Sequence, residues 1–240
     1  MTALLETRSV TKAFGGLTAV SGVDLAIATG DLHCLIGPNG AGKSTLFKLI
    51  VGQHAASAGA IVFDGEDITD ALPFARVQRG ISMKMQAPNI FKNLSTRQNL
   101  HIALQRRATP RQVLLEEERL LELLELRLDA GKPAGTLSHG QQQWLEIGMA
   151  LSLAPRLMLL DEPTAGMSPE ETHRTGELVQ RLNADGMAIL VVEHDMEFVR
   201  QIARQVTVMH LGRVFARGSI DEIVADPRVA EIYLGTAHVH

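Results

Sequence analysis

The chain contains 240 residues, of which 45% are hydrophobic, enough apolar material to build one large packed domain. Its formal net charge of −4 provides no basic surface field, so nucleic acid is not expected as a partner. The single cysteine, Cys34, excludes an intrachain disulfide and is expected to lie buried in a strand.

The sequence carries neither a secretory signal nor a membrane-spanning run. Glu6 stands near the N-terminus, and no apolar stretch follows a basic start as it would in a signal peptide. The apolar run at 187–192 falls far short of the roughly 20 residues that a spanning helix requires. We therefore expect a cytoplasmic protein.

The first 30 residues predict a small antiparallel β layer. Apolar and polar residues alternate on both sides of Phe14–Gly15–Gly16, as in two strands joined by a hairpin. Phe14 has two interpretations here: an ordinary core phenylalanine, or an exposed ring available for stacking.

Short apolar runs further along predict strands of a largely parallel sheet that is covered on both faces. They lie at 31–36, 60–63, 157–160, 188–192 and 206–210. Residues 87–150 carry no such run, and leucines at helical spacing over 110–128 predict a helical insertion. The tail predicts a hairpin around Gly212 and two short helices. The fold class is therefore α/β.

The stretch GPNGAGKST at 37–45 has the spacing of a phosphate-binding P-loop, between a predicted strand and a predicted helix. Glycines let backbone N–H groups approach phosphate oxygens, and the helix start adds the positive end of its dipole. Lys43 can then reach the β- and γ-phosphates, and Ser44 can ligate Mg²⁺. The alternative is a glycine-rich turn. The predicted nucleotide-contacting residues are Gly37, Pro38, Asn39, Gly40, Ala41, Gly42, Lys43, Ser44 and Thr45.

Two carboxylates follow the apolar run at 157–160. Asp161 at the strand end suits a Mg²⁺ ligand acting through water, and Glu162, which points the other way in an extended chain, could polarise an attacking water. A helix N-cap would also explain two acids here. The upstream P-loop favours the catalytic interpretation.

Two further polar residues follow predicted strands. His194 ends the strand at 188–192, at the carboxyl edge where ligands of parallel sheets collect, and this favours a γ-phosphate contact over a structural histidine. Gln86 follows the run at 81–85 and begins the helical insertion, where its amide could contact Mg²⁺ or the attacking water.

The stretch LSHGQQQWLEIGMA at 137–150 begins a predicted helix with Ser, His, Gly and Gln. Together with the P-loop, Gln86, Asp161–Glu162 and His194, it stands in the order and approximate spacing of an ATP-binding cassette (ABC) ATPase, which nearly the whole chain resembles. The resemblance implies a P-loop NTPase of the ABC ATPase fold: a mixed, mainly parallel core sheet, an N-terminal antiparallel β layer and a helical subdomain.

This resemblance also implies a single nucleotide-binding domain over 1–240, with a core of 1–86 and 151–240 and a helical subdomain of 87–150. In the family, two cassettes bind ATP and Mg²⁺ head to tail, between the P-loop of one and the signature segment of the other. Phe14 corresponds to the aromatic residue that stacks on adenine. The signature residues expected at the partner's γ-phosphate are Ser138, His139, Gly140 and Gln141, at the positive end of a helix that buries Trp144 and Ile147.

The chain departs from the family pattern at two positions. His139 replaces the first of the two glycines usual in the family's LSGGQ signature, and its backbone N–H keeps a phosphate contact only if its φ is negative. Ser168 stands where many members have aspartate, which puts the usual inter-subunit contact of that loop in doubt.

The segments FGGLTAVSGVDL, TAGMSPEE and DPRVAEIYLG resemble the branched-chain amino acid importer ATPases. LSHGQQQWLEIGMAL and the segment around His194, VVEHDMEFVRQIARQVTVMHLGRV, are similar to their urea and short-chain amide members. The resemblance implies a peripheral ATPase at the cytoplasmic face of the inner membrane. It would pair with itself or a sister ATPase and with two integral-membrane permease subunits, served indirectly by a periplasmic substrate-binding protein. Phe91 would anchor a permease helix in a groove formed by residues 87–100. The alternative is a packing role, in which the apolar residues of this segment only close the helical lobe.

Two alternatives use the same cassette. One is an ATPase that extracts lipid or lipopolysaccharide, and the other is a non-transport ABC protein. A P-loop kinase or GTPase is disfavoured, because neither explains the LSHGQ segment ahead of the second acid.

Overall fold

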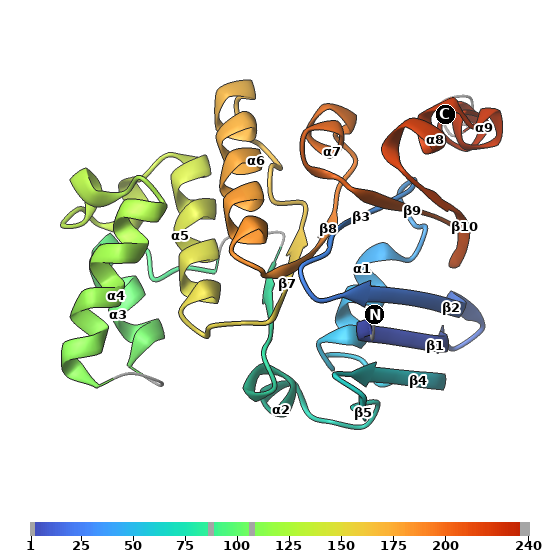
Figure 1. Ribbon diagram of the computed structural model, residues 1–240, viewed down its shortest axis with the longest axis horizontal. Helices are drawn as coiled ribbons and strands as arrows, with labels where there is room; N and C mark the ends of the chain where they lie inside the picture. Colours follow the sequence, from blue (N-terminus) through green and yellow to red (C-terminus); the bar gives the residue numbers. More distant parts are fainter. Residues whose placement is uncertain (1–2, 86–88, 106–108, 236–240) are drawn as a thin grey trace.

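The computed structural model describes residues 3–85, 89–105 and 109–235 (Figure 1). An antiparallel sheet contains the N-terminal hairpin, as the sequence predicts, with the strand order β2-β1-β4-β5. Its strands are β1 (Ala3–Phe14), β2 (Leu17–Ala28), β4 (Ala58–Phe63) and β5 (Glu66–Asp67). The apolar run at 60–63 was expected in the parallel sheet, and that expectation is wrong: β4 pairs antiparallel with β1. A short apolar run can be buried equally well in a strand of either sheet, so hydrophobicity alone could not assign the strand with which this run pairs.

The second sheet has the order β10-β9-β3-β8-β7-β6 and forms the core. Strands β6, β7, β8, β3 and β9 pair in parallel, and β10 joins β9 antiparallel around Gly212, so the sheet is mixed, as expected. Its strands are β3 (Leu32–Ile36), β6 (Ile81–Lys84), β7 (Leu157–Asp161), β8 (Ala188–Val192), β9 (Gln205–His210) and β10 (Arg213–Gly218). All residues of β3, β7 and β8 are buried.

Helices cover this sheet, and some of them lie beyond one end of it. They are α1 (Lys43–Ile50), α2 (Pro73–Gln78), α3 (Thr96–Leu104), α4 (Pro110–Leu123), α5 (His139–Leu151), α6 (Pro169–Ala184), α7 (Met196–Ile202), α8 (Ile220–Ala225) and α9 (Pro227–Gly235), with short 3₁₀ turns at Arg127–Asp129 and Ala134–Thr136. Figure 1 shows α3, α4 and α5 grouped at the end opposite the antiparallel layer. The helical insertion is confirmed as helical, while its exact limits stay a prediction.

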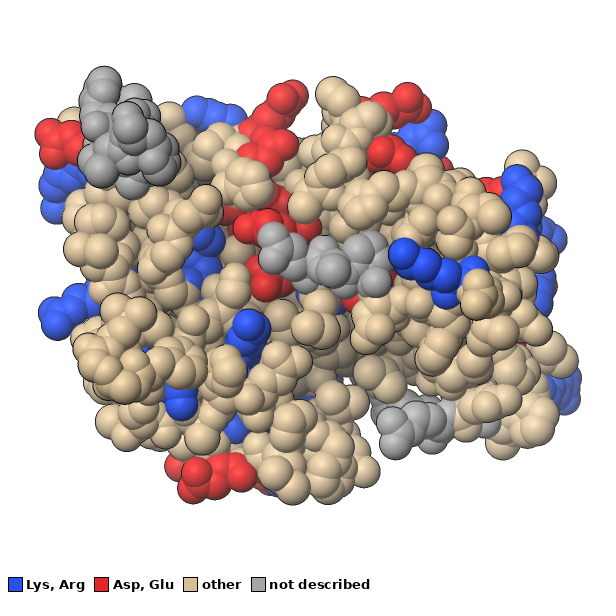
Figure 2. Space-filling model, turned by 180° about the vertical axis from the view of Figure 1, so that it is seen from behind, with Lys and Arg blue, Asp and Glu red and all other residues tan. Residues whose placement is uncertain are grey.

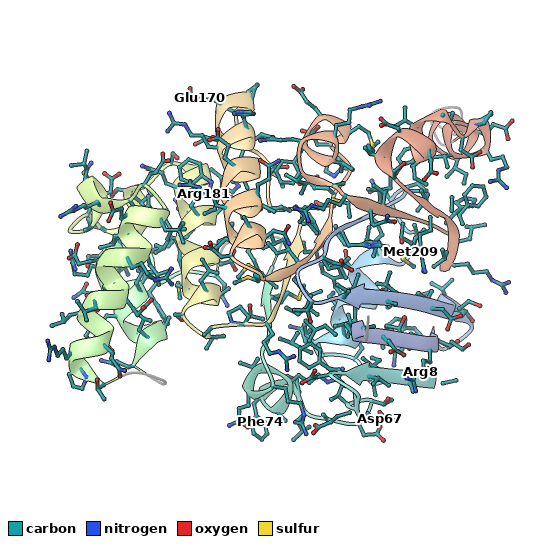
Figure 3. The ribbon with its side chains drawn as sticks, in the orientation of Figure 1. Arg8, Asp67, Phe74, Glu170, Arg181 and Met209 are labelled. Atoms are coloured by element: carbon teal, nitrogen blue, oxygen red, sulfur yellow. The ribbon has the colours of Figure 1, made fainter. Side chains whose placement is uncertain are left out.

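Alternation along the core strands separates two apolar clusters. Leu157 and Leu159 of β7 pack with α1 and the antiparallel layer, whereas Met158 and Leu160 pack with the cluster that includes α5, α6 and α7. Met209 of β9 belongs to the first cluster, between the two sheets (Figure 3). The core sheet is thereby covered on both faces. Polar side chains also lie within it: His33 of β3 and Thr207 of β9 are buried and hydrogen-bonded at 2.8 Å.

Two further expectations on the core are settled. Cys34 is fully buried in β3, and burial raises the pKa of its thiol. Within the described ranges, none of the helices has the length and apolar character that crossing a membrane would need.

Candidate nucleotide site

The loop 37–42 connects buried β3 to α1 and has a shape that only glycine permits at two positions. A Cβ on Gly37 would lie 2.2 Å from the carbonyl oxygen of Met209, and a Cβ on Gly42 would lie 2.4 Å from that of Ala19. Gly42 also has φ +99°. The loop is therefore fixed by backbone packing against β9 and β2, and it leads directly into the α1 N-terminus, where anions bind.

Lys43 lies inside this loop. Its side chain is buried, and its Nζ donates to the carbonyl oxygens of Gly37 at 2.6 Å and Pro38 at 3.0 Å. Burial lowers its pKa, while the carboxylates of Glu162 and Asp161 oppose that shift. Of the other predicted loop residues, Ala41 is buried, Thr45 is half-buried, and Asn39, Gly40 and Ser44 are exposed.

Asp161 ends β7 next to α1. It is 5% exposed, accepts a hydrogen bond from Ser44, and keeps Oδ1 without a hydrogen-bond partner among the described residues. Burial and the neighbouring Glu162 raise its pKa. A buried carboxylate oxygen without a proton donor, beside a serine hydroxyl at the phosphate loop, fits the hard oxygen ligands that Mg²⁺ prefers.

Glu162 follows with a strained backbone. Its φ is +47°, uncommon for a residue with a side chain, and its N–H donates to the carbonyl oxygen of Val192 at 2.9 Å. His194 Nδ1 lies 3.8 Å from Glu162 Oε1, and the His194 side chain is 63% exposed. The N-cap alternative is wrong for both acids, because the next helix, α6, begins at Pro169 with Ser168 as its N-cap.

Glu193 is a residue that sequence reasoning missed. It is 1% exposed, and one carboxylate oxygen accepts from Thr164 Oγ1 at 2.5 Å and from Thr164 N at 3.2 Å. Its other oxygen accepts from the N–H of His194 at 2.9 Å. Glu193 therefore joins the loops that follow β7 and β8. A charged residue directly ahead of His194 at the end of an apolar strand was the available signal.

Gln86 lies outside the described residues, but the chain on both sides of it is held to α5. Lys84 ends β6 with its ammonium fully buried, and Glu146 of α5 accepts from the N–H of Asn89 at 3.2 Å. Burial lowers the pKa of Lys84 and raises that of Glu146 to about 7. Met85 and Asn89, the described residues nearest to Gln86, thus bind the helix that begins with the signature residues through Glu146.

Phe14 is an exposed ring and not a core residue. Its side chain is 43% exposed, it meets the His54 ring edge to face at 5.2 Å, and Lys12 Nζ lies 5.0 Å from its ring centre. The core interpretation is therefore wrong, and adenine stacking stays a prediction.

The signature residues form the N-terminus of α5. Ser138 is the N-cap of this helix. The Ser138 Oγ accepts a hydrogen bond from the Gln141 N–H, and the side-chain oxygen of Gln141 accepts one from the Ser138 N–H. His139 begins the helix with a negative φ, so its backbone N–H stays available. Trp144 and Ile147 are buried as expected, and the Trp144 indole donates to Thr175 Oγ1 at 2.8 Å.

Within one chain, the signature helix and the phosphate loop are apart. Figure 1 places α6 between α5 and α1. Figure 2 shows Asp and Glu side chains gathered near the middle of the rear face. The geometry of one chain therefore assembles the P-loop, Asp161, Glu162 and His194, and leaves the signature residues facing elsewhere.

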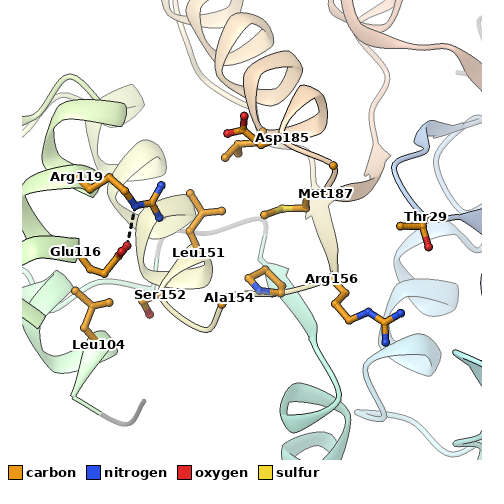
Figure 4. A pocket seen from close by; sticks show the side chains of 13 residues that line it. Thr29, Leu104, Glu116, Arg119, Leu151, Ser152, Ala154, Arg156, Asp185 and Met187 are labelled. Carbon is orange, nitrogen blue, oxygen red and sulfur yellow. Dashed lines mark hydrogen bonds and ion pairs between the residues drawn. The ribbon is translucent and has the colours of Figure 1, made fainter. Parts of the chain in front are cut away.

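A hollow of about 630 Å³ lies away from these residues. It is lined by Leu104, Leu151 and Met187, with Arg119 paired to Glu116 at its wall (Figure 4). Met187 precedes β8, whereas His194 follows it, so this hollow is at the opposite edge of the sheet. Ligands of parallel sheets collect at the carboxyl edge, which favours the P-loop side as the functional site.

The C-terminal helix also reaches the phosphate loop. Tyr233 of α9 packs against the core, and burial raises its pKa to about 12 although a hydrogen bond with the Gly37 backbone opposes the shift. No motif in the sequence predicts that this tyrosine lies at the site.

Comparison with known proteins gives two family matches. Residues 20–165 match the ABC transporter family, and residues 213–239 match the branched-chain amino acid ATP-binding cassette transporter family. The high-affinity branched-chain amino acid transport ATP-binding protein BraF of Pseudomonas aeruginosa is 34% identical over 98% of both chains.

Other relatives are named for the transport of other substrates. The lipopolysaccharide export system ATP-binding protein LptB of Acidithiobacillus ferridurans is 35% identical over 98% of both chains. A ribose import ATP-binding protein of Escherichia coli O157:H7 is 36% identical, and the match spans 43% of its length. A crystal structure of an ABC transporter cassette in its ADP conformation superposes with a TM-score of 0.89 at 33% identity, covering 98% of this chain and 100% of the other.

Proposed function

The chain belongs to the ABC transporter ATPases, which hydrolyse ATP, and we propose that it powers an importer of the branched-chain amino acid group, with urea or a short-chain amide as its substrate. The match of residues 213–239 carries the importer assignment, because the general match at 20–165 does not separate one transporter class from another. Urea or amide specificity rests on the signature and His194 segments of the sequence.

The proposed site chemistry uses residues that one chain brings to the phosphate loop. The loop 37–42 and the α1 N-terminus bind the ATP phosphates, and Lys43 turns from the loop carbonyls to the β- and γ-phosphates. Ser44, and Asp161 through a water, would hold Mg²⁺, with Gln86 as a further ligand, and the ion would neutralise charge on the transferred phosphate. Glu162 orients and polarises the attacking water, and the exposed His194 contacts the γ-phosphate beside it.

The second half of the site comes from another cassette. Ser138 and the N–H groups of His139, Gly140 and Gln141 lie at a helix N-terminus but away from their own phosphate loop, so they serve the ATP of a head-to-tail partner. That partner is a second copy or a sister ATPase. Phe14 stacks on the adenine ring of the ATP bound by its own chain.

Phe91 supplies the contact with the membrane subunits. Its ring is 50% exposed, while its N–H donates to Asn99 Oδ1 at 2.7 Å and its carbonyl accepts from Asn99 Nδ2 at 3.0 Å. A fixed backbone with an exposed aromatic ring suits an anchor for a short permease helix. Two permease subunits, fed by a periplasmic binding protein, complete the importer at the cytoplasmic face of the inner membrane.

A lipid or lipopolysaccharide extraction system is the second candidate, because the LptB relative matches over the same length at similar identity. Purification of the tagged chain from its native cells, followed by identification of the co-purifying membrane subunits, separates the two. The complex is then reconstituted in vesicles with ATP, and uptake of labelled urea, acetamide and leucine is compared with that of a Glu162→Gln complex.

Glu162-dependent uptake of urea or acetamide supports the full proposal. Leucine uptake alone supports the importer and contradicts the amide specificity. Lipid-extraction subunits, without uptake of any of the three solutes, favour the second candidate.

A further inference from the structure

The start of α5 is hydrogen-bonded to two neighbouring parts of the same chain: the first turn of α6 and the loop that follows Glu162. Glu171, in the first turn of α6, accepts the Ser138 hydroxyl on Oε1 at 2.9 Å and the Ser168 N–H on Oε2 at 3.0 Å. His139 Nε2 lies 3.0 Å from the carbonyl oxygen of Ala165. A carbonyl only accepts, so Nε2 must carry the proton and His139 donates.

The contact is close enough to restrict the neighbouring residue. A Cβ on Gly140 would lie 2.6 Å from the Glu171 carboxylate, so the signature glycine leaves room for this acid. The Ser168 N–H, and after it the Ser138 hydroxyl, lower the pKa of Glu171. The acid is therefore ionised at neutral pH and places a negative charge beside Ser138.

Ser138 cannot serve two acceptors at once. A serine hydroxyl has one proton, and here Glu171 receives it, while Ser138 Oγ accepts from the N–H of Gln141 at 3.1 Å. In a head-to-tail dimer the same proton would be donated to a γ-phosphate oxygen. The carboxylate and the phosphate therefore compete for Ser138, and their like charges oppose each other.

We propose that Glu171 is a positioning residue that sets the ATP concentration at which the dimer closes, by holding the Ser138 proton until a phosphate takes it. This inference rests on the proposed head-to-tail site. Glu171 keeps its bond to Ser168 when it releases Ser138, so arrival of the phosphate leaves the α6 start capped but removes one of the hydrogen bonds that join it to the α5 start.

Glu171→Gln tests this while preserving the fold. The capping box accepts glutamine as well as glutamate, so the new amide oxygen still receives the Ser168 N–H and the α6 start is retained. The amide NH₂ then donates to Ser138 Oγ, which frees the serine proton and removes the charge. In the assembled complex we expect KM for ATP to fall about 3–10-fold with kcat within about twofold, and ATP affinity of the isolated chain to stay unchanged.

Glu170→Gln is the matched control. Glu170 has the same charge one residue earlier and pairs with Arg174 at 2.8 Å, not with Ser138 (Figure 3 labels Glu170). An unchanged or raised KM in Glu171→Gln overturns the proposal, as does an equal fall in Glu170→Gln, which would indicate a general charge effect. Thermal unfolding of both variants shows whether α6 is intact, and Glu171→Ala, which also frees the Ser138 proton and has the highest helix propensity, replaces Glu171→Gln if it is not.

The outcomes separate two failures. A wild-type complex that neither hydrolyses ATP nor transports contradicts the proposed function itself. An active wild-type complex whose KM does not respond to Glu171→Gln contradicts only the role of Glu171.

Discussion

The phosphate loop and the signature helix start would both hold phosphate through backbone N–H groups, yet the chain fixes them by different means. Gly37 and Gly42 pack against carbonyl oxygens of β9 and β2, so the loop keeps its shape through backbone contacts. The α5 start is instead held by side-chain hydrogen bonds from Ser138 and His139.

This difference predicts which half of the site can adjust. Backbone packing at Gly37 cannot change unless β9 moves, whereas an exposed side-chain hydrogen bond contributes only about 1 kcal/mol and can be exchanged for a ligand. We therefore regard the phosphate loop as the preformed half and the signature end as the adjustable half.

The largest expected effect tests whether Glu162, next to the preformed phosphate loop, takes part in ATP hydrolysis. Glu162→Gln should lower ATP turnover by about 10²-fold or more, because an amide cannot act as the base for the attacking water. ATP binding should persist, and an ATP-bound dimer should accumulate. Lys43→Ala is the comparison, since it should weaken ATP binding itself. Near-normal turnover of Glu162→Gln in the assembled transporter would contradict the role.

The next effect tests the backbone packing. Gly37→Ala should lower the free energy of unfolding by about 3 kcal/mol or more, because the new methyl meets the Met209 carbonyl. Gly40→Ala is the matched control: its Cβ would meet nothing within 4 Å, so only the strain of a positive φ remains, about 1–2 kcal/mol. Urea unfolding measures both, and equal losses would show that the close contact does not fix the loop.

The pH dependence of stability extends the comparison to β3, the strand that precedes the phosphate loop. His33 of β3 is buried, and burial lowers its pKa from 6.5 to about 4. The folded protein therefore keeps this imidazole neutral, while the unfolded chain binds a proton below pH 6.5. Its contribution to stability is present above pH 6.5 and is lost as the pH falls towards 4, by about 2 kcal/mol at pH 5.

The measurement is urea unfolding at pH 7 and pH 5, for the wild type and for His33→Gln. Between these two pH values, the wild type should lose about 2 kcal/mol more than the variant. Parallel losses in the two proteins would show that His33 ionises equally in both states.

The smallest expected effect concerns Phe91, on the surface of the helical insertion that also contains the signature helix α5. Phe91→Ala should leave ATP binding by the isolated chain intact but weaken permease association and uncouple hydrolysis from uptake, with a loss of about 1–2 kcal/mol in binding. Leu128→Ala is the control, because Leu128 is 94% exposed on the helical insertion. Normal assembly and transport by Phe91→Ala, or unfolding of the variant, would leave Phe91 with a packing role.

The sequence by itself determined the α/β class, the N-terminal hairpin and the phosphate loop. These features depend on local rules: alternation, apolar strand runs, and a fixed spacing of glycines and Lys43. It also predicted that Trp144 would be buried and that Asp161 and Glu162 would follow a buried strand, because each follows from position within one element.

Only the tertiary structure decided the sheet of β4, the exposure of Phe14, and the contacts of Glu193 and Glu171. Three of these depend on a partner distant in the sequence: β1 for β4, Thr164 for Glu193, and Ser138 for Glu171. An apolar run or a carboxylate specifies that a partner is needed but not which one. The fold chooses that partner, because packing brings together segments that no local pattern relates.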